Sequence, residues 1–336
     1  MKHSNISIFI PHLGCPHACS FCNQNTISGE TKAPTADEVR ETLKKALQEV
    51  KDRRNTEIAF FGGSFTAIDR EYMLDLLKTA NEFLGDNGFY GIRISTRPDF
   101  IDKEILDILK GFGVTAIELG AQSMCDEVLL ANERGHTASD VVNASKLIKK
   151  FGFELGLQMM TGLYKSTPEL DLFTAGEIIR LKPKTVRIYP VSVLKGTKLH
   201  SLYSSGEYKL ISFEDMVSLC SKILIMFKDA GIDVIRCGLH ASNDVNENLI
   251  TGYYHPAFKE LCEGLIYRDE AERLIHGSKN RHFEFLVNDK CISKALGQKK
   301  ENVKYFDDKG ISIKFIPDKD MPIYKLKLTD TYDERR

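Results

Sequence analysis

The sequence predicts an α/β protein, in which a parallel sheet closes partway into a TIM-like barrel of six β/α units and a small α+β domain follows. Three observations predict this class. Short apolar runs alternate with segments of helical periodicity. Polar residues follow each apolar run, as they do at the catalytic end of barrel enzymes. A separate strand, helix, helix, strand pattern begins near residue 280. The predicted divisions are therefore 1–240, a helical linker over 241–280, and 281–336.

The elements of the barrel follow from periodicity. The first predicted strand is 6–10, and a helix over 36–54 follows it, because Val39, Leu43 and Leu47 recur at helical spacing behind a capping Thr35. The second strand, 58–61, runs directly into a Gly-Gly pair. The remaining predicted strands are 91–95, 114–119, 154–160 and 185–189, and the remaining helices are 70–84, 102–112, 139–151 and 168–181.

Composition limits the class of protein. With 336 residues and 42% apolar residues, the chain can bury one large core and a small appendage. Formal charge is balanced, with 46 basic and 47 acidic residues, so it implies no obligate polyanion partner. No apolar run is long enough for a membrane span, and the first residues lack an apolar signal region. We expect a soluble, cytoplasmic protein without a membrane partner.

Three cysteines stand close together directly after the first predicted strand. Cys15, Cys19 and Cys22 have C-x3-C-x2-C spacing, and thiolates this close in sequence can bind one metal centre. A structural zinc site requires four ligands, so three cysteines would need His12 or His17 as the fourth. Such a zinc knuckle is one alternative to a cluster, and three unrelated thiols are the other. The other cysteines lack metal spacing, and we expect buried, inert thiols at Cys125, Cys220, Cys237, Cys262 and Cys291.

With Phe21 as the aromatic residue before the last cysteine, this motif resembles the signature of the radical S-adenosylmethionine (SAM) superfamily. The resemblance implies a [4Fe-4S] cluster on Cys15, Cys19 and Cys22, with one iron free to bind the amino and carboxylate groups of SAM. It also implies an external one-electron reductant, such as a flavodoxin or ferredoxin, and cleavage of SAM to a 5′-deoxyadenosyl radical that abstracts hydrogen from the substrate. Its fold is the partial (β/α)6 barrel predicted above.

The same resemblance assigns cofactor contacts to the strand ends. Gly62, Gly63 and Ser64 occupy the place of the Gly-Gly-Glu-like motif that contacts the SAM amino group, with serine in place of glutamate. Arg134 resembles the arginine that binds the SAM carboxylate, which suits a planar guanidinium. By their position at strand ends, the further candidate cofactor-binding residues are Ser95, Gln122, Gln158 and Arg187, and Phe21 of the cysteine motif is another candidate. Taken singly, each is more often a structural polar residue.

Three segments, 95–99, 120–123 with 132–137, and 187–197, together resemble the catalytic subunit of Elongator, which modifies the wobble uridine of tRNA. The resemblance covers residues 6–240. Two departures leave the substrate open: nothing after residue 240 resembles an acetyltransferase domain, and the cysteines are more tightly spaced. The alternatives are a small-molecule enzyme resembling anaerobic coproporphyrinogen oxidase, whose fourth cysteine is replaced here by Gln24, and a non-enzymatic iron-sulfur protein that binds RNA.

The tail resembles the KH RNA-binding module. We expect a helix over 257–275, strands over 282–287 and 311–316, and two helices, 292–296 and 301–308, with Gly297 between them. Residues 276–336 hold 14 Lys/Arg and 10 Asp/Glu. A KH module clamps RNA with a Gly-x-x-Gly loop, and here Lys300 replaces the second glycine. The lysines that could meet phosphates are Lys294, Lys299, Lys300 and Lys304. The alternative is a small cap whose lysines face water.

Overall fold

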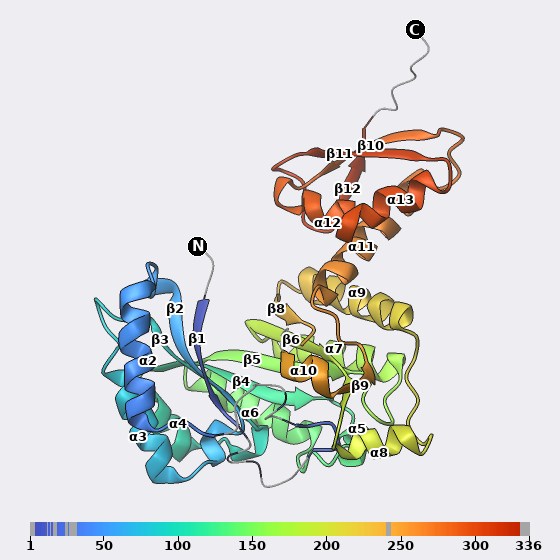
Figure 1. Cartoon of the computed structure of the whole chain (residues 1–336). Helices are drawn as coiled ribbons and strands as arrows, with labels where there is room; N and C mark the ends of the chain where they lie inside the picture. The colour runs from blue at the N-terminus through green and yellow to red at the C-terminus, as the bar shows by residue number, and fades with distance from the viewer. Residues whose placement is uncertain are drawn as a thin grey trace.

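The computed structural model describes residues 4–11, 13, 15, 19–23, 26, 32–239 and 243–329. Most of the described chain forms one parallel sheet with helices packed against it, and a tail with a sheet of its own (Figure 1). None of the helices in these ranges is long and apolar enough to cross a membrane.

The large sheet has seven strands in the order β1-β2-β3-β4-β5-β6-β8, and each neighbouring pair is parallel. In the described part of the chain β1 and β8 are its two edges, so the sheet is a partial barrel and the predicted fold class is confirmed. Its strands are β1 (Ser4–Ile10), β2 (Thr56–Gly62), β3 (Gly91–Thr96), β4 (Val114–Gln122), β5 (Glu154–Thr161), β6 (Thr185–Pro190) and β8 (Asp233–Cys237).

The helices begin where capping residues predict. Thr35 and Thr137 form capping boxes with the third helical residue, and Asp69 and Asp102 cap their helices through side-chain oxygens. The helices of this part of the chain are α2 (Ala36–Glu49), α3 (Arg70–Asn81), α4 (Lys103–Gly111), α5 (Asp126–Ala131), α6 (Ala138–Lys150), α7 (Pro168–Leu181), α8 (Lys198–Ser204) and α9 (Phe213–Asp229). Their apolar stripes share one core with the sheet.

Two predicted helices were too long at their C-terminal ends. The helix predicted over 70–84 ends at Asn81, because a turn follows it and Leu84 already forms a β-bridge with Phe89. The helix predicted over 36–54 ends at Glu49, because Val50 is already extended and a short 3-10 turn, Arg53–Asn55, leads into β2. Several elements were not predicted at all. Besides α5, α8, α9 and β8, they are the antiparallel pair β7 (Ser192–Leu194) and β9 (Leu249–Gly252), α10 (Asn243–Asn248) and, in the tail, the short strand β12 (Leu326–Leu328).

The tail follows α11 (Phe258–Ile275), a helix that packs against α9. Its order is β10 (His282–Val287), α12 (Ile292–Leu296), α13 (Glu301–Asp307), β11 (Ser312–Pro317) and β12 (Leu326–Leu328), which confirms the strand, helix, helix, strand pattern. β10 pairs in parallel with β11 and antiparallel with β12 over a separate apolar core. Figure 1 shows the tail at one end of the molecule, with α5 and α8 at the opposite end.

Candidate functional site

The ends of β1 and β2 are in direct backbone contact. The Gly63 amide donates to the Ile10 carbonyl at 2.8 Å, and the Ser64 amide donates to the Leu13 carbonyl at 3.3 Å. A Cβ on Gly63 would lie 2.1 Å from the Leu13 carbonyl oxygen, so no side chain fits there. The Cys15 Sγ lies 3.8 Å from the Ser64 Oγ. The first part of the cysteine loop therefore packs directly against the Gly-Gly-Ser segment, residues 62–64.

This contact leads to a first prediction. Gly63→Ala should lower the free energy of unfolding by about 1–3 kcal/mol and reduce the iron retained after reconstitution, because the new methyl group displaces the cysteine loop. Gly176→Ala is the matched control, since a Cβ there, within α7, would have no atom within 4 Å. Urea unfolding and iron content per chain measure both effects. Equal iron content in the two variants would contradict this role of Gly63.

Asn132 anchors the other part of the cysteine loop. Its side-chain oxygen accepts from the Ser20 hydroxyl at 2.8 Å, and its carbonyl accepts from the Ser20 amide at 3.1 Å. Its amide group donates to the carbonyls of Val128 and Tyr164, both at 2.8 Å. The Ser20 carbonyl in turn accepts from the Leu199 amide at 2.7 Å, at the start of α8. Sequence reasoning did not select Asn132, whose only signal was its place in the polar stretch 132–137.

Arg134 joins the cysteine loop to the end of β4. Its guanidinium is buried and donates to the Cys19 Sγ at 3.0 Å and to the Gly120 carbonyl at 2.7 Å. Its Nε has no partner among the described residues. Gln122, the last residue of β4, has a φ of 64° and a buried Oε1 that also lacks a described partner. A strained backbone and unsatisfied buried polar atoms make this end of β4 a candidate binding site.

These residues fit the implied cofactors. The cationic Arg134 guanidinium beside the Cys19 thiol suits a cluster held by anionic thiolates. The Arg134 Nε–H could donate to the carboxylate of an amino acid, and the Gln122 Oε1 could accept from its amino group. In the described residues no three His, Cys, Asp or Glu side chains are arranged to hold a metal ion, so the three thiols are not gathered around one point. Cys19 and Phe21 are buried, Cys15 and Cys22 are half-buried, and the alternative ligands His12 and His17 lie outside the described residues.

Two other predicted cofactor residues lie elsewhere, inside the barrel. The Arg187 guanidinium donates to both oxygens of Glu118, at 2.6 and 3.0 Å, and lies 4.9 Å from the ring centre of Phe61. The Gln158 amide donates to Glu118 at 3.2 Å. The structure therefore groups Gln158 and Arg187 around Glu118, and Gln122 and Arg134 at the cysteine loop. Ser95, at the end of β3, is buried.

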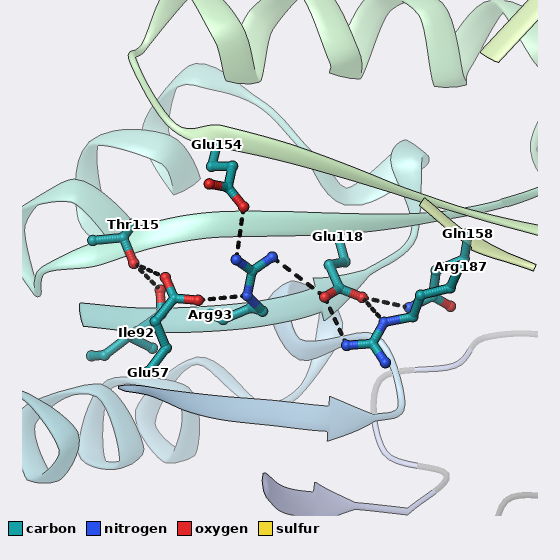
Figure 2. A network of polar contacts seen from close by, with 8 residues as sticks. All are labelled: Glu57, Ile92, Arg93, Thr115, Glu118, Glu154, Gln158 and Arg187. Carbon is teal, nitrogen blue, oxygen red and sulfur yellow. Dashed lines mark hydrogen bonds and ion pairs between the residues drawn. The ribbon is translucent and has the colours of Figure 1, made fainter. Parts of the chain in front are cut away.

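Glu118 and Arg93 are the centre of this network (Figure 2), and neither was predicted as a site residue from the sequence. The Arg93 guanidinium donates to Glu57 at 2.6 Å, to Glu154 at 2.8 Å and to Glu118 at 3.4 Å. Burial raises the pKa of Glu118, but the charges of Arg187 and Arg93 outweigh it and hold that pKa below its ordinary value. The available signal was a charged residue between apolar neighbours in each of two strands, Arg93 between Ile92 and Ile94 and Glu118 between Ile117 and Leu119.

Comparison with known families gives two matches. Residues 9–173 match the radical SAM superfamily, and residues 183–268 match the radical SAM C-terminal domain. The first match contains every residue of the cysteine loop, the Gly-Gly-Ser segment and Arg134. The second begins at the sixth strand of the barrel and ends within α11.

Several similar proteins come from species of Methanocaldococcus. An uncharacterized protein of Methanocaldococcus jannaschii is 32% identical over 224 residues, which cover 63% of this chain and 68% of that protein. A tRNA uridine(34) acetyltransferase of the same organism is 33% identical over 187 residues, but the match spans only 34% of its length. The structure of Methanocaldococcus infernus Elp3 with an N-terminal deletion has a TM-score of 0.64 at 21% identity, covering 79% of this chain and 63% of that one. This last likeness shows a shared fold.

Proposed function

This chain belongs to the radical SAM superfamily and is an enzyme of that group, and from this we propose that it cleaves SAM reductively and acts on tRNA or another RNA. The proposed cleavage of SAM is supported by the grouping of Cys19, Arg134 and Gln122. A thiol, a buried cation and unsatisfied buried polar atoms lie together there at the end of β4. The substrate class draws on the relatives, one of which is called a tRNA uridine(34) acetyltransferase.

Cys15, Cys19 and Cys22 would hold a [4Fe-4S] cluster, which when bound supplies one electron for the cleavage of SAM. The chain's own residues orient the reactants. Asn132 and Gly63 hold the loop, and the Arg134 guanidinium offsets negative charge at the thiolates. The partnerless Nε of Arg134 would bind the SAM carboxylate. An external reductant of the flavodoxin or ferredoxin type would deliver the electron.

Anaerobic reconstitution with iron and sulfide, reduction with dithionite, and assay of 5′-deoxyadenosine in the presence of SAM test the first part. We expect 5′-deoxyadenosine to form without added substrate, as uncoupled cleavage. A protein that takes up a cluster but leaves SAM intact under strong reductant would not support the enzymatic proposal, and a binding role for the iron-sulfur site would replace it.

The position of the tail supports a long substrate. The tail stands at the end of the molecule opposite α8 (Figure 1). The Leu199 amide, in the first turn of α8, donates to the Ser20 carbonyl of the cysteine loop. A domain so placed suits the binding of a distant part of an RNA better than it suits a lid over a small substrate. The KH-like turn presents two exposed lysines, Lys299 and Lys300, with φ of 53° and 60°. Lys294 instead pairs with the buried Glu263 at 2.8 Å.

The turn gives a second prediction. Lys299→Glu with Lys300→Glu should weaken tRNA binding and lower the slope of log affinity against log salt by about 2, because each lost phosphate contact releases one counterion fewer. Lys45→Glu with Lys51→Glu changes the charge equally at exposed sites near α2. Fluorescence anisotropy between 50 and 200 mM salt measures both slopes, a range in which such contacts dominate. If both pairs of substitutions changed the slope equally, the tail would have no specific part in RNA binding.

A further inference from the structure

His136 lies beside the candidate SAM site, and neither the sequence motifs nor the matches assign it a role. His136 is 5% exposed, and its ring Nε2 lies 3.3 Å from the Ala121 carbonyl oxygen. Because a carbonyl only accepts, Nε2 must carry the proton and donate. Burial, followed by the charge of Arg134, lowers the pKa of the ring to about 4, so it is neutral at pH 7. A neutral imidazole that is protonated on Nε2 has an acceptor at Nδ1.

That acceptor has no partner among the described residues, although Nδ1 is buried. A buried polar atom without a partner costs about 1–3 kcal/mol, unless a ligand or a water satisfies it. Two more such atoms belong to the same strand end, the Gln122 Oε1 and the Arg134 Nε. Arg134 is held on the Gly120 carbonyl, His136 on the next carbonyl, and Gln122 follows directly. The last three residues of β4 thus position one unpaired donor, the Arg134 Nε–H, and two unpaired acceptors, the His136 Nδ1 and the Gln122 Oε1.

An α-amino acid complements this set. Its carboxylate accepts, which suits the Arg134 Nε–H, and its amino group has at least two N–H donors even when its lone pair binds a metal. Adenine and ribose carry no carboxylate for the guanidinium. We propose that His136 is a cofactor-binding residue whose Nδ1 accepts a hydrogen bond from the amino group of SAM, beside Gln122. This inference rests on the proposed reaction with SAM.

Two substitutions separate binding from structural support. The amide nitrogen of glutamine can take the place of Nε2, so His136→Gln keeps the bond to Ala121 and loses the acceptor. The side-chain oxygen of asparagine can take the place of Nδ1, so His136→Asn keeps the acceptor and loses the bond to Ala121. Calorimetry of SAM and of methylthioadenosine, which lacks the amino acid, should be done on the reconstituted protein. Thermal unfolding and iron content of each variant are measured alongside.

We expect His136→Gln to weaken SAM binding about tenfold, which corresponds to one hydrogen bond, and His136→Asn to stay within about threefold of the wild type. Neither variant should change binding of methylthioadenosine, which also reports that the site is folded. The opposite order of the two variants would assign His136 a structural role, and equal affinities, or an equal loss for both ligands, would also overturn the inference. A wild type that does not bind SAM would instead overturn the proposed function.

Discussion

Cys19→Ala should reduce formation of 5′-deoxyadenosine to less than about 1% of the wild-type rate, which is a loss of at least about 2.7 kcal/mol of activation. The physical reason is specific to this thiol. Cys19 is buried and accepts a hydrogen bond from Arg134 at 3.0 Å, so its loss removes a proposed cluster ligand and also the partner of a buried cation. The same variant should retain little iron after anaerobic reconstitution.

Cys125→Ser is the matched control. Cys125 is half-buried, stands directly before α5 and lies outside the cysteine loop. Its substitution should leave iron content and 5′-deoxyadenosine formation close to those of the wild type. If Cys19→Ala retained full iron content and cleaved SAM, the thiol would not be a ligand, and the proposed reaction would lose its centre.

The barrel could be predicted from the sequence because its signals are local. The strands are short apolar runs, and capping residues such as Thr35 and Asp102 stand directly before their helices. β8 has no such signal, since the charged residues Asp233 and Arg236 leave only two adjacent apolar residues between them. β7, with three residues, exists only because β9, more than 50 residues later, pairs with it.

In the candidate site, too, some residues could be predicted from local sequence patterns and others only from contacts between distant segments. The cysteines are recognised by their spacing, and the Gly-Gly pair by its place directly after the second strand. The roles of Asn132 and His136 depend on contacts with Ser20 and Ala121, which lie 112 and 15 residues away in the sequence. Arg187 was predicted to bind the cofactor because it stands in a terminal segment of a strand, but only the structure shows that Glu118 pairs with it. Pairing between distant charges has no sequence pattern.

Glu118→Gln should lower the free energy of unfolding by about 3–5 kcal/mol, which is the typical cost of leaving a buried cation without its partner. The Glu118 side chain is 1% exposed and serves Arg187 and Arg93, whose side chains are 13% and 3% exposed. Glutamine fills the same volume, so the cost is electrostatic and leaves no cavity. Urea unfolding at pH 7 measures it, with Glu41→Gln, at the exposed pair with Lys44, as a control that should change little.

The loss should also depend on pH. Because the pKa of Glu118 is lowered in the folded state, its stabilisation is present above the ordinary pKa of a glutamate and is lost as the pH falls through the lowered pKa. The stability difference between wild type and Glu118→Gln should therefore narrow in acid. Arg187→Gln should cost less in the Glu118→Gln background than in the wild type, since the partner is already absent. Additive costs would mean that the two side chains do not stabilise each other, and that Arg187 is held over Phe61 by other contacts.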